Sequence, residues 1–237
     1  MVKEGLNPKF YVLDIGNEET IVKLRDFMKE KYGGIDVLVN NAGMAYKGAA
    51  TEPFGEQATF TVATNYWDNK TACEILFPIL KPGARVVNMS SSAGFLGNLG
   101  ARGGDKTKAE QLKKKLSSDD LTVKELDGYM KNFVETANAG THESHGWPNS
   151  TYVVSKIGWS ALSRIQQREM KKDPRQDIVI NHVHPGYVDT DMTSHRGVLS
   201  IDRSEHIIHF SIFNHVSIIP EELSQECLQP CFLQALM

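Results

Sequence analysis

The sequence predicts an α/β fold built on a parallel sheet, and two observations support this. Short apolar segments at 35–43, 85–94 and 176–186 end in small or turn residues, as strands buried on both faces do. Segments with helical spacing at 17–33, 56–80 and 150–172 alternate with them. Such alternation places ligands at the carboxyl ends of the strands. The run "FYVLDI" (10–15) predicts a further strand, and "KPGA" (81–84) predicts a turn that closes the 56–80 helix.

Composition favours a single soluble domain that acts on a small molecule. The chain has 237 residues and a net charge of -3, which gives no electrostatic reason to expect nucleic acid or an anionic membrane as a partner. Three scattered cysteines argue for a reducing compartment rather than a disulfide framework. No apolar run reaches the length of a membrane span and none resembles a signal peptide. We therefore expect a cytoplasmic protein.

Two regions, the segment between Gly94 and Trp147 and the tail from Ser204, invite other interpretations. The run "KTKAEQLKKKL" at 106–116 could be a basic nucleic-acid patch, but "SSDD" and "KELD" balance its charge at once, so a solvated helical insertion at about 95–147 is favoured. In the tail, a metal site would use His206, His209, His215, Cys227 and Cys231. The cysteine spacing is not that of zinc sites and no paired histidines accompany it, so we expect no metal.

The stretch "YVVSK" places Tyr152 and Lys156 one helical turn apart, on one face of the predicted helix. The motif is short enough to occur by chance, and Tyr66 with Lys70 is a second match. Context separates the two. Asn40 to Gly43, Ser90 to Ser92 and Pro185 to Thr190 fall at the carboxyl ends of predicted strands, where ligands of a parallel sheet bind.

In this order, "LVNNAG", "RVVNMSS", "TYVVSK" and "HPGYVDTDM" resemble the motifs of the short-chain dehydrogenase/reductase family. More narrowly, "LDI", "FMKEKYGGIDVLVNNAG", "GWPNSTYVVSKIG" and the long insertion before the Tyr resemble the cytosolic carbonyl reductases that use NADPH. The resemblance covers residues 1 to about 203. It implies a Rossmann-type doubly wound parallel sheet, with reduction of aldehydes, ketones or quinones. Tyr66 and Lys70 lack a preceding strand that carries a Ser and are expected to be structural.

The resemblance implies a catalytic set. A Tyr with a pKa near 10 is a poor acid–base group at neutral pH, and Lys156 is expected to lower the pKa of Tyr152 by its charge. Ser91 would hydrogen-bond the substrate oxygen, whereas Ser90 and Ser92 are expected to form the turn. Asn65 matches the family residue that relays protons through water. Taken alone, it would more readily be a helix-interior residue that bonds backbone, but the presence of Ser91, Tyr152 and Lys156 favours the relay role.

The resemblance also implies where ligands bind. Asp14 would bond adenine, Asn41 would lie at the adenosine side, and residues 188 to 190 would lie near the nicotinamide amide; for Asn40, a tie between strands is an equal alternative. The full expectation for NADPH is Leu13, Asp14, Asn41, Tyr152, Lys156, Val188, Asp189 and Thr190. For substrate or glutathione conjugates it is Tyr46, Lys47, Gln57, Ser91 and Thr151. By resemblance, the insertion covers the helix face through which most of the family dimerises, so we expect a monomer.

The sequence departs from the family pattern at both ends. The family's first strand, its T-G-x-x-x-G-x-G turn and its second strand have no counterpart in this sequence, so the expected sheet lacks two strands and one edge is exposed and apolar. We expect an incomplete reductase domain at 1–203, in which binding of the cofactor phosphates and therefore activity are impaired, and a divergent tail at 204–237. Two alternatives remain open: a non-catalytic isoform or pseudo-enzyme that acts as an interaction protein, and a reductase of steroid or prostaglandin carbonyls.

Overall fold

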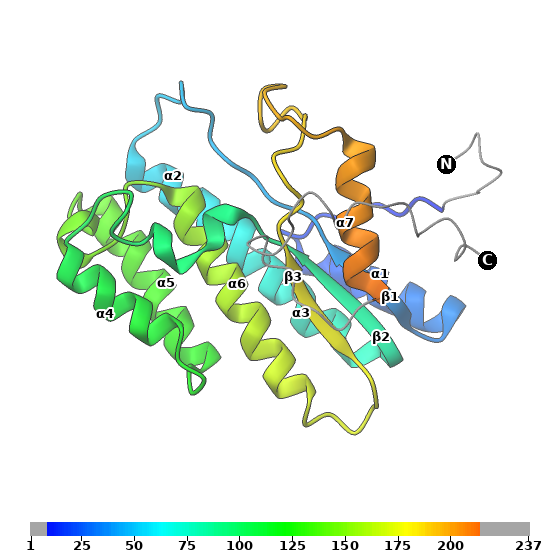
Figure 1. The fold of residues 1–237 in the computed structure, drawn as a ribbon. Coiled ribbons are helices and arrows are strands. Elements are labelled where there is room, and N and C mark those ends of the chain that lie inside the picture. Colours follow the sequence, from blue (N-terminus) through cyan, green and yellow to red (C-terminus); the bar gives the residue numbers. More distant parts are fainter. Residues whose placement is uncertain (1–8, 214–237) are drawn as a thin grey trace.

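A computed structural model describes residues 9–213, and it contains a three-stranded parallel sheet at the centre of an α/β fold (Figure 1). The strands are β1 (Ile35–Asn40), β2 (Leu80–Met89) and β3 (Val179–Val183), in the order β1-β2-β3. Their pairing is in register at the carboxyl end, where Asn40 lies opposite Asn88 and Asn88 opposite His182. The predicted fold class is confirmed.

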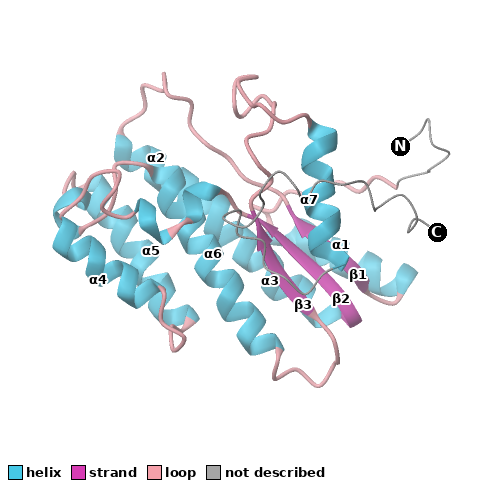
Figure 2. Cartoon of the chain, in the orientation of Figure 1, coloured by secondary structure: helices cyan, strands magenta, loops and turns pink. Residues whose placement is uncertain are grey.

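Helices cover both faces of the sheet, as its apolar strands require. The helices α1 (Glu18–Tyr32), α3 (Asn69–Leu76) and α6 (Thr151–Met170) lie on one side, and the α1 and α3 residues Ile21 and Leu76 share a core with Val86 of β2. Because successive strand residues point to opposite faces, Val87 packs on the other side, against α7 (Ile201–Phe213) (Figure 2).

The predicted long helix at 56–80 is present but is not regular. It comprises α2 (Phe54–Val62), a π-helical turn η2 (Ala63–Asp68), α3 and a short 3-10 turn η3 (Phe77–Ile79). The predicted turn at 81–84 is wrong, because these residues already belong to β2. Gly83 has a φ of 80°, and its N–H donates to the carbonyl of Gln176, so the chain bends within the strand instead of ending it.

The predicted strand at 10–15 is also wrong: these residues form no strand. A strand needs a hydrogen-bonded neighbour, and in the described part of the chain the nearest sheet edge, β1, pairs only with β2. Instead, Asp14 forms a turn in which its carboxylate accepts from the N–H of Gly16 at 2.9 Å. The expected apolar edge is present, since Val37 and Val39 of β1 are 46% and 40% exposed.

The insertion is helical, as predicted, but it is more than a solvated appendage. Its helices α4 (Lys106–Leu116) and α5 (Val123–Asn138) lie beyond α6, on the side away from the sheet (Figure 1). Phe133 and Trp147 are fully buried in the largest core cluster, together with α2 and α6 residues. The short 3-10 turns η4 (Ser92–Gly94), η5 (Leu96–Asn98) and η6 (His142–His145) frame this region.

Truncation of Phe133 to Ala is expected to lower the free energy of unfolding by about 3–5 kcal/mol, because it leaves a cavity in this cluster. The ring of Phe133 makes edge contacts with Phe54 and Trp147, at centroid distances of 6.3 and 5.5 Å. Chemical denaturation would measure the loss. Glu135→Ala, an exposed change on the same helix, serves as the control and should stay within about 0.5 kcal/mol of the wild type. A cost for Phe133→Ala below about 1 kcal/mol would mean that the insertion is not part of the core.

The helix α7, in the carboxyl-terminal region, packs on the sheet. This helix begins at Ile201 and continues through the predicted domain boundary at 203, and its Ile208 and Ile212 pack on β2 and β3. His206 and His209 lie on α7, whereas His215, Cys227 and Cys231 lie outside the described residues. Within residues 9–213, no cluster of three or more potential ligands could hold a metal ion, and no helix has the length and apolar character to cross a membrane.

Candidate functional site

Tyr152 and Lys156 lie in the first turns of α6, close to the carboxyl end of β2. Ser150 caps the helix, and its hydroxyl accepts from the N–H of Val153. Lys156 is 6% exposed, and its Nζ donates to the carbonyl of Met89, the last residue of β2, at 2.8 Å. The same Nζ lies 5.6 Å from the centroid of the Tyr152 ring. The helix therefore holds a phenol and an ammonium together at the edge where a parallel sheet binds ligands.

Ser91, which follows β2, lies against Tyr152. Its hydroxyl is close enough to the phenol to favour the ionised form of Tyr152, and it accepts from the N–H of Ala93 at 3.1 Å. The expected role of Ser90 is wrong, because Ser90 is buried and its hydroxyl lies 2.6 Å from that of Ser160 on α6. Ser90 ties the strand end to the helix, and Ser91 is left facing the phenol.

Burial has the largest effect on the pKa values of Tyr152 and Lys156. It raises the pKa of Tyr152, and the hydrogen bond from Ser91 opposes that rise. Burial also lowers the pKa of Lys156 to about 8. The expected lowering of the Tyr152 pKa by Lys156 is therefore not found in this structure. Tyr152 is protonated at neutral pH, which is the state that a proton donor needs.

Asn65 is 1% exposed and lies in the π-helical turn η2, a local widening that is frequent at functional sites. Its amide group clasps the chain after β1: Nδ2 donates to the carbonyl of Met44 at 2.9 Å, and Oδ1 accepts from the Met44 N–H at 2.7 Å. Nδ2 also donates to the hydroxyl of Ser155 at 2.9 Å. Asn65 thus hydrogen-bonds backbone, as expected for a helix-interior structural residue, and it also contacts the helix that carries Tyr152 and Lys156.

Two contributors to this network had no role assigned to them from the sequence, although Gly43 lies in the segment 40–43 where ligands were expected to bind. Ser155 is fully buried and links Asn65 to the carbonyl of Tyr152, to which its hydroxyl donates at 2.9 Å. Its position between Tyr152 and Lys156 on a helix was the available signal. Gly43 is the second: a Cβ there would lie 3.2 Å from Asn65 Oδ1 and 3.6 Å from Lys156 Nζ, so a larger residue would crowd the cluster.

Asn40 serves as a tie between strands, the alternative that was left open. Its Nδ2 donates to Asn88 Oδ1 at 2.8 Å, and Asn88 Nδ2 in turn donates to Ser163 on α6 at 2.8 Å. All three side chains are buried. Asn40 and Asn88 therefore fix β1, β2 and α6 beneath the candidate site.

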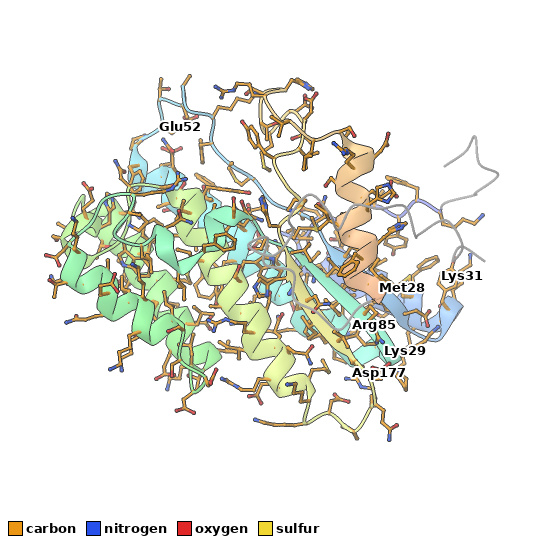
Figure 3. All side chains as sticks on the ribbon, viewed as in Figure 1. Met28, Lys29, Lys31, Glu52, Arg85 and Asp177 are labelled. Carbon is orange, nitrogen blue, oxygen red and sulfur yellow. The ribbon has the colours of Figure 1, made fainter. Side chains whose placement is uncertain are left out.

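The other predicted ligand-binding residues lie in segments near the same end of the sheet. Leu13, Asp14, Asn41 and Asp189 are exposed, and Val188 and Thr190 are half-buried in the loop after β3. In the long loop before α2, marked by Glu52 in Figure 3, burial raises the pKa of Tyr46, and Gln57 donates to the carbonyl of Glu52 at 2.8 Å. Lys47 is exposed.

Thr151 was predicted to contact the substrate, and Tyr66 and Lys70 were predicted to be structural. Thr151 is 6% exposed, and its hydroxyl donates to Thr61 on α2 at 3.3 Å, so the structure places it in the packing between helices and not at an open surface. Tyr66 and Lys70 are structural, as expected: the hydroxyl of Tyr66 donates to Asp127 at 2.9 Å, and Lys70 pairs with the same carboxylate at 2.8 Å.

One buried polar atom at this edge lacks a partner. His184 follows β3 directly, and its Nδ1 is buried with no hydrogen bond among the described residues. Burial lowers the pKa of His184. An unpaired buried nitrogen is costly, and a bound water, ion or ligand is one way to satisfy it. The exposed acidic and amide side chains, the ammonium of Lys156 and this nitrogen suit a large polar cofactor at the edge of the sheet.

Comparisons with known proteins agree with this arrangement. Residues 1–120 match a family model described as enoyl-(acyl carrier protein) reductase. The chain is 43% identical to carbonyl reductase [NADPH] 1 of Rattus norvegicus over 198 residues, which is 83% of this chain and 69% of that protein. It is 41% identical to rat carbonyl reductase [NADPH] 3, over 84% of this chain and 70% of that protein.

Solved structures give the same result for the fold. Salutaridine reductase from Papaver somniferum superposes with a TM-score of 0.72 at 25% identity, over 86% of this chain and 77% of that one. Menthone neomenthol reductase from Mentha piperita gives 0.63 at 25% identity, over 86% and 74% of the two chains. The chain therefore belongs to the short-chain dehydrogenase/reductase family, as a carbonyl reductase-like oxidoreductase.

Proposed function

We propose that this protein is an NADPH-dependent carbonyl reductase that reduces small aldehydes, ketones or quinones. The observation that carries the proposal is the contact of Ser91 with Tyr152 beside the buried ammonium of Lys156. The printed names of the rat relatives, carbonyl reductase [NADPH] 1 and 3, support the choice of cofactor and of carbonyl substrates. A cytoplasmic location, glutathione conjugates as substrates, and a monomeric state in which α5 covers α6 belong to the same proposal.

In this proposal each side chain has a defined task. Tyr152 donates its phenolic proton to the carbonyl oxygen, and its raised pKa keeps that proton in place at neutral pH. Ser91 donates a hydrogen bond to the same oxygen and orients it. Lys156 brings a positive charge to within reach of the developing phenolate, and its Nζ keeps two donors beyond the one given to Met89.

In the proposal, Asn65 and Ser155 support the proton donor Tyr152 by positioning its helix. Ser155 connects Asn65 to the backbone of Tyr152, so both residues hold the start of α6 in one orientation. Leu13, Asp14, Asn41 and residues 188 to 190 are the proposed cofactor contacts. Bound NADPH would supply the hydride. Tyr46, Lys47 and Gln57 are the proposed substrate contacts; we do not retain Thr151, because it is buried against α2.

Titration with NADPH tests the cofactor assignment directly. We expect quenching of the intrinsic tryptophan fluorescence with a micromolar dissociation constant, and weaker quenching by NADH. The wild-type chain is compared with Lys156→Ala, which should bind more weakly if the ammonium contacts the cofactor. Absence of any binding to the wild-type chain would sink the proposal. The non-catalytic alternative, an isoform that acts as an interaction protein, would then be the one to pursue.

A further inference from the structure

The segment from Tyr187 to Leu199 forms a compact loop between β3 and α7, which we call the 187–199 loop (Figure 1). Its base is closed by backbone: the N–H of Asp189 donates to the carbonyl of Leu199 at 2.8 Å, and the N–H of Leu199 donates to Tyr187 at 3.0 Å. Thr193 tightens it from within, since its hydroxyl donates to the carbonyl of Val188 at 2.8 Å. The loop is thus held by its own hydrogen bonds, and Pro185 and Gly186 join it to the sheet.

One side chain spans the open part of the loop. The Nδ1 of His195 lies 2.8 Å from a carboxylate oxygen of Asp189, and its Nε2 lies 3.0 Å from one of Asp191. An ionised carboxylate only accepts hydrogen bonds, so both ring nitrogens must carry a proton for both bonds to form. The geometry therefore requires the charged imidazolium. Neutral His195 could keep one of the two bonds, and its other nitrogen would face a carboxylate with a lone pair.

The backbone supports the same interpretation. Ser194 and His195 have φ values of 52° and 55°, a left-handed conformation that is uncommon for residues other than Gly. Such strain persists only where surrounding contacts hold it. Here the contacts are the two carboxylate bonds and the bond from the His195 N–H to the carbonyl of Thr190, at 3.0 Å.

We propose that His195 is a positioning residue: its imidazolium form holds Asp189 and Asp191 together and thereby fixes the 187–199 loop. Because residues 188 to 190 are proposed cofactor contacts, this inference rests on the proposed function. The consequence is a pH-dependent site, ordered when His195 is charged and loosened when it is neutral.

The sign of the pH dependence follows from the charges that face His195. The hydrogen bonds to Asp189 and Asp191 raise the pKa of His195, with their Coulombic attraction as a further cause. No other charged group in the described part of the chain contributes to this rise. We call the paired bonds of His195 to Asp189 and Asp191 the clamp. The clamp is thus complete below the ordinary histidine pKa near 6.5 and is lost as pH rises through the raised pKa of His195. Since the His195 side chain is 68% exposed, salt should weaken the clamp.

Hydrogen exchange of the loop amides tests the proposal in the full chain. After correction for intrinsic exchange rates, we expect the protection factors of the amides of residues 189–199 to fall about three- to fivefold between pH 6 and pH 8.5. His195→Asn tolerates the left-handed backbone but cannot charge, so it should show the low protection at both pH values. His195→Arg keeps a permanent cation and should restore protection at pH 8.5. His145→Asn, a change of an exposed histidine in η6, should behave as the wild type.

The outcomes separate this inference from the proposed function. Protection that does not change with pH in the wild type, or a pH dependence that survives in His195→Asn, would overturn the clamp. Histidine NMR gives a second measurement: the raised pKa of His195 should return toward its ordinary value in an Asp189→Asn, Asp191→Asn double variant. If the loop titrates as expected but NADPH fails to bind at either pH, the clamp stands and the cofactor assignment falls.

Discussion

Tyr152→Phe is expected to lower carbonyl reduction by about a hundred- to ten-thousandfold, the usual contribution of a positioned general acid. The change removes one hydroxyl and keeps the ring. Ser91 loses its contact with the phenol, while the bonds of Lys156 to Met89 and of Asn65 to Ser155 remain. NADPH affinity should change by only a few fold. Steady-state oxidation of NADPH with a quinone substrate, together with the binding titration, measures both quantities.

The chain contains a matched control for this prediction. Tyr66 and Lys70 have the same spacing as Tyr152 and Lys156, but the hydroxyl of Tyr66 is bonded to Asp127 inside the helical layer. Tyr66→Phe should therefore lower the free energy of unfolding by about 1–3 kcal/mol, because the partly buried carboxylate of Asp127 loses a donor, and should leave the turnover rate nearly unchanged. Retention of most activity by Tyr152→Phe, or loss of it in Tyr66→Phe with the fold intact, would contradict the assignment of the acid.

Lys156→Met is expected to abolish most activity and at the same time to raise stability at pH 7, by about 1–3 kcal/mol. The ammonium of Lys156 is buried, and burial lowers its pKa to about 8, whereas an unfolded lysine titrates near 10.5. Between these two values the unfolded chain binds more protons than the folded one, so wild-type stability rises with pH through this window. Below pH 8 the full cost of burying the charge remains, on the order of 3 kcal/mol.

Denaturation curves from pH 7 to pH 10 would test this. The stability advantage of Lys156→Met should be largest near pH 7 and should shrink above pH 8, as wild-type Lys156 loses its proton. Lys70→Met is the matched control with the opposite sign, because it strips Asp127 of a cation that lies 2.8 Å away. A Lys156→Met variant less stable than the wild type at pH 7 would show that the ammonium stabilises the fold, and that its burial is not a functional cost.

The sequence predicted the parts of the fold that depend on local pattern. The three strands and the helices α1 and α6 follow from apolar runs and helical spacing. The helix α7 was not predicted, because the sequence from 204 was expected to diverge from the family. The failures have physical causes. Residues 10–15 have the composition of a strand, but a strand also needs a neighbour, which composition does not report. The bend in β2 at Gly83 was taken for a turn because Pro-Gly usually ends an element.

The candidate site divides in the same way. Tyr152, Lys156 and Ser91 were predicted from motif order, and the structure brings their side chains together. The structural ties around them depend on tertiary contacts: Ser155 meets Asn65 across 90 positions of sequence, and Ser90 turns toward Ser160 instead of forming a turn. The direction in which the pKa of Tyr152 shifts could not be predicted from residue types, because burial raises this pKa by more than the nearby groups lower it.

The transfer of deuterium is the most direct test of the central claim that this chain reduces carbonyls. The wild-type protein is incubated with NADPH that carries deuterium at the transferable position and with an aromatic aldehyde, and the product is examined by mass spectrometry. The proposal predicts one deuterium on the former carbonyl carbon of the aldehyde-derived alcohol, and a strong loss of this product in Tyr152→Phe. A wild-type chain that binds NADPH but yields no deuterated alcohol would contradict it.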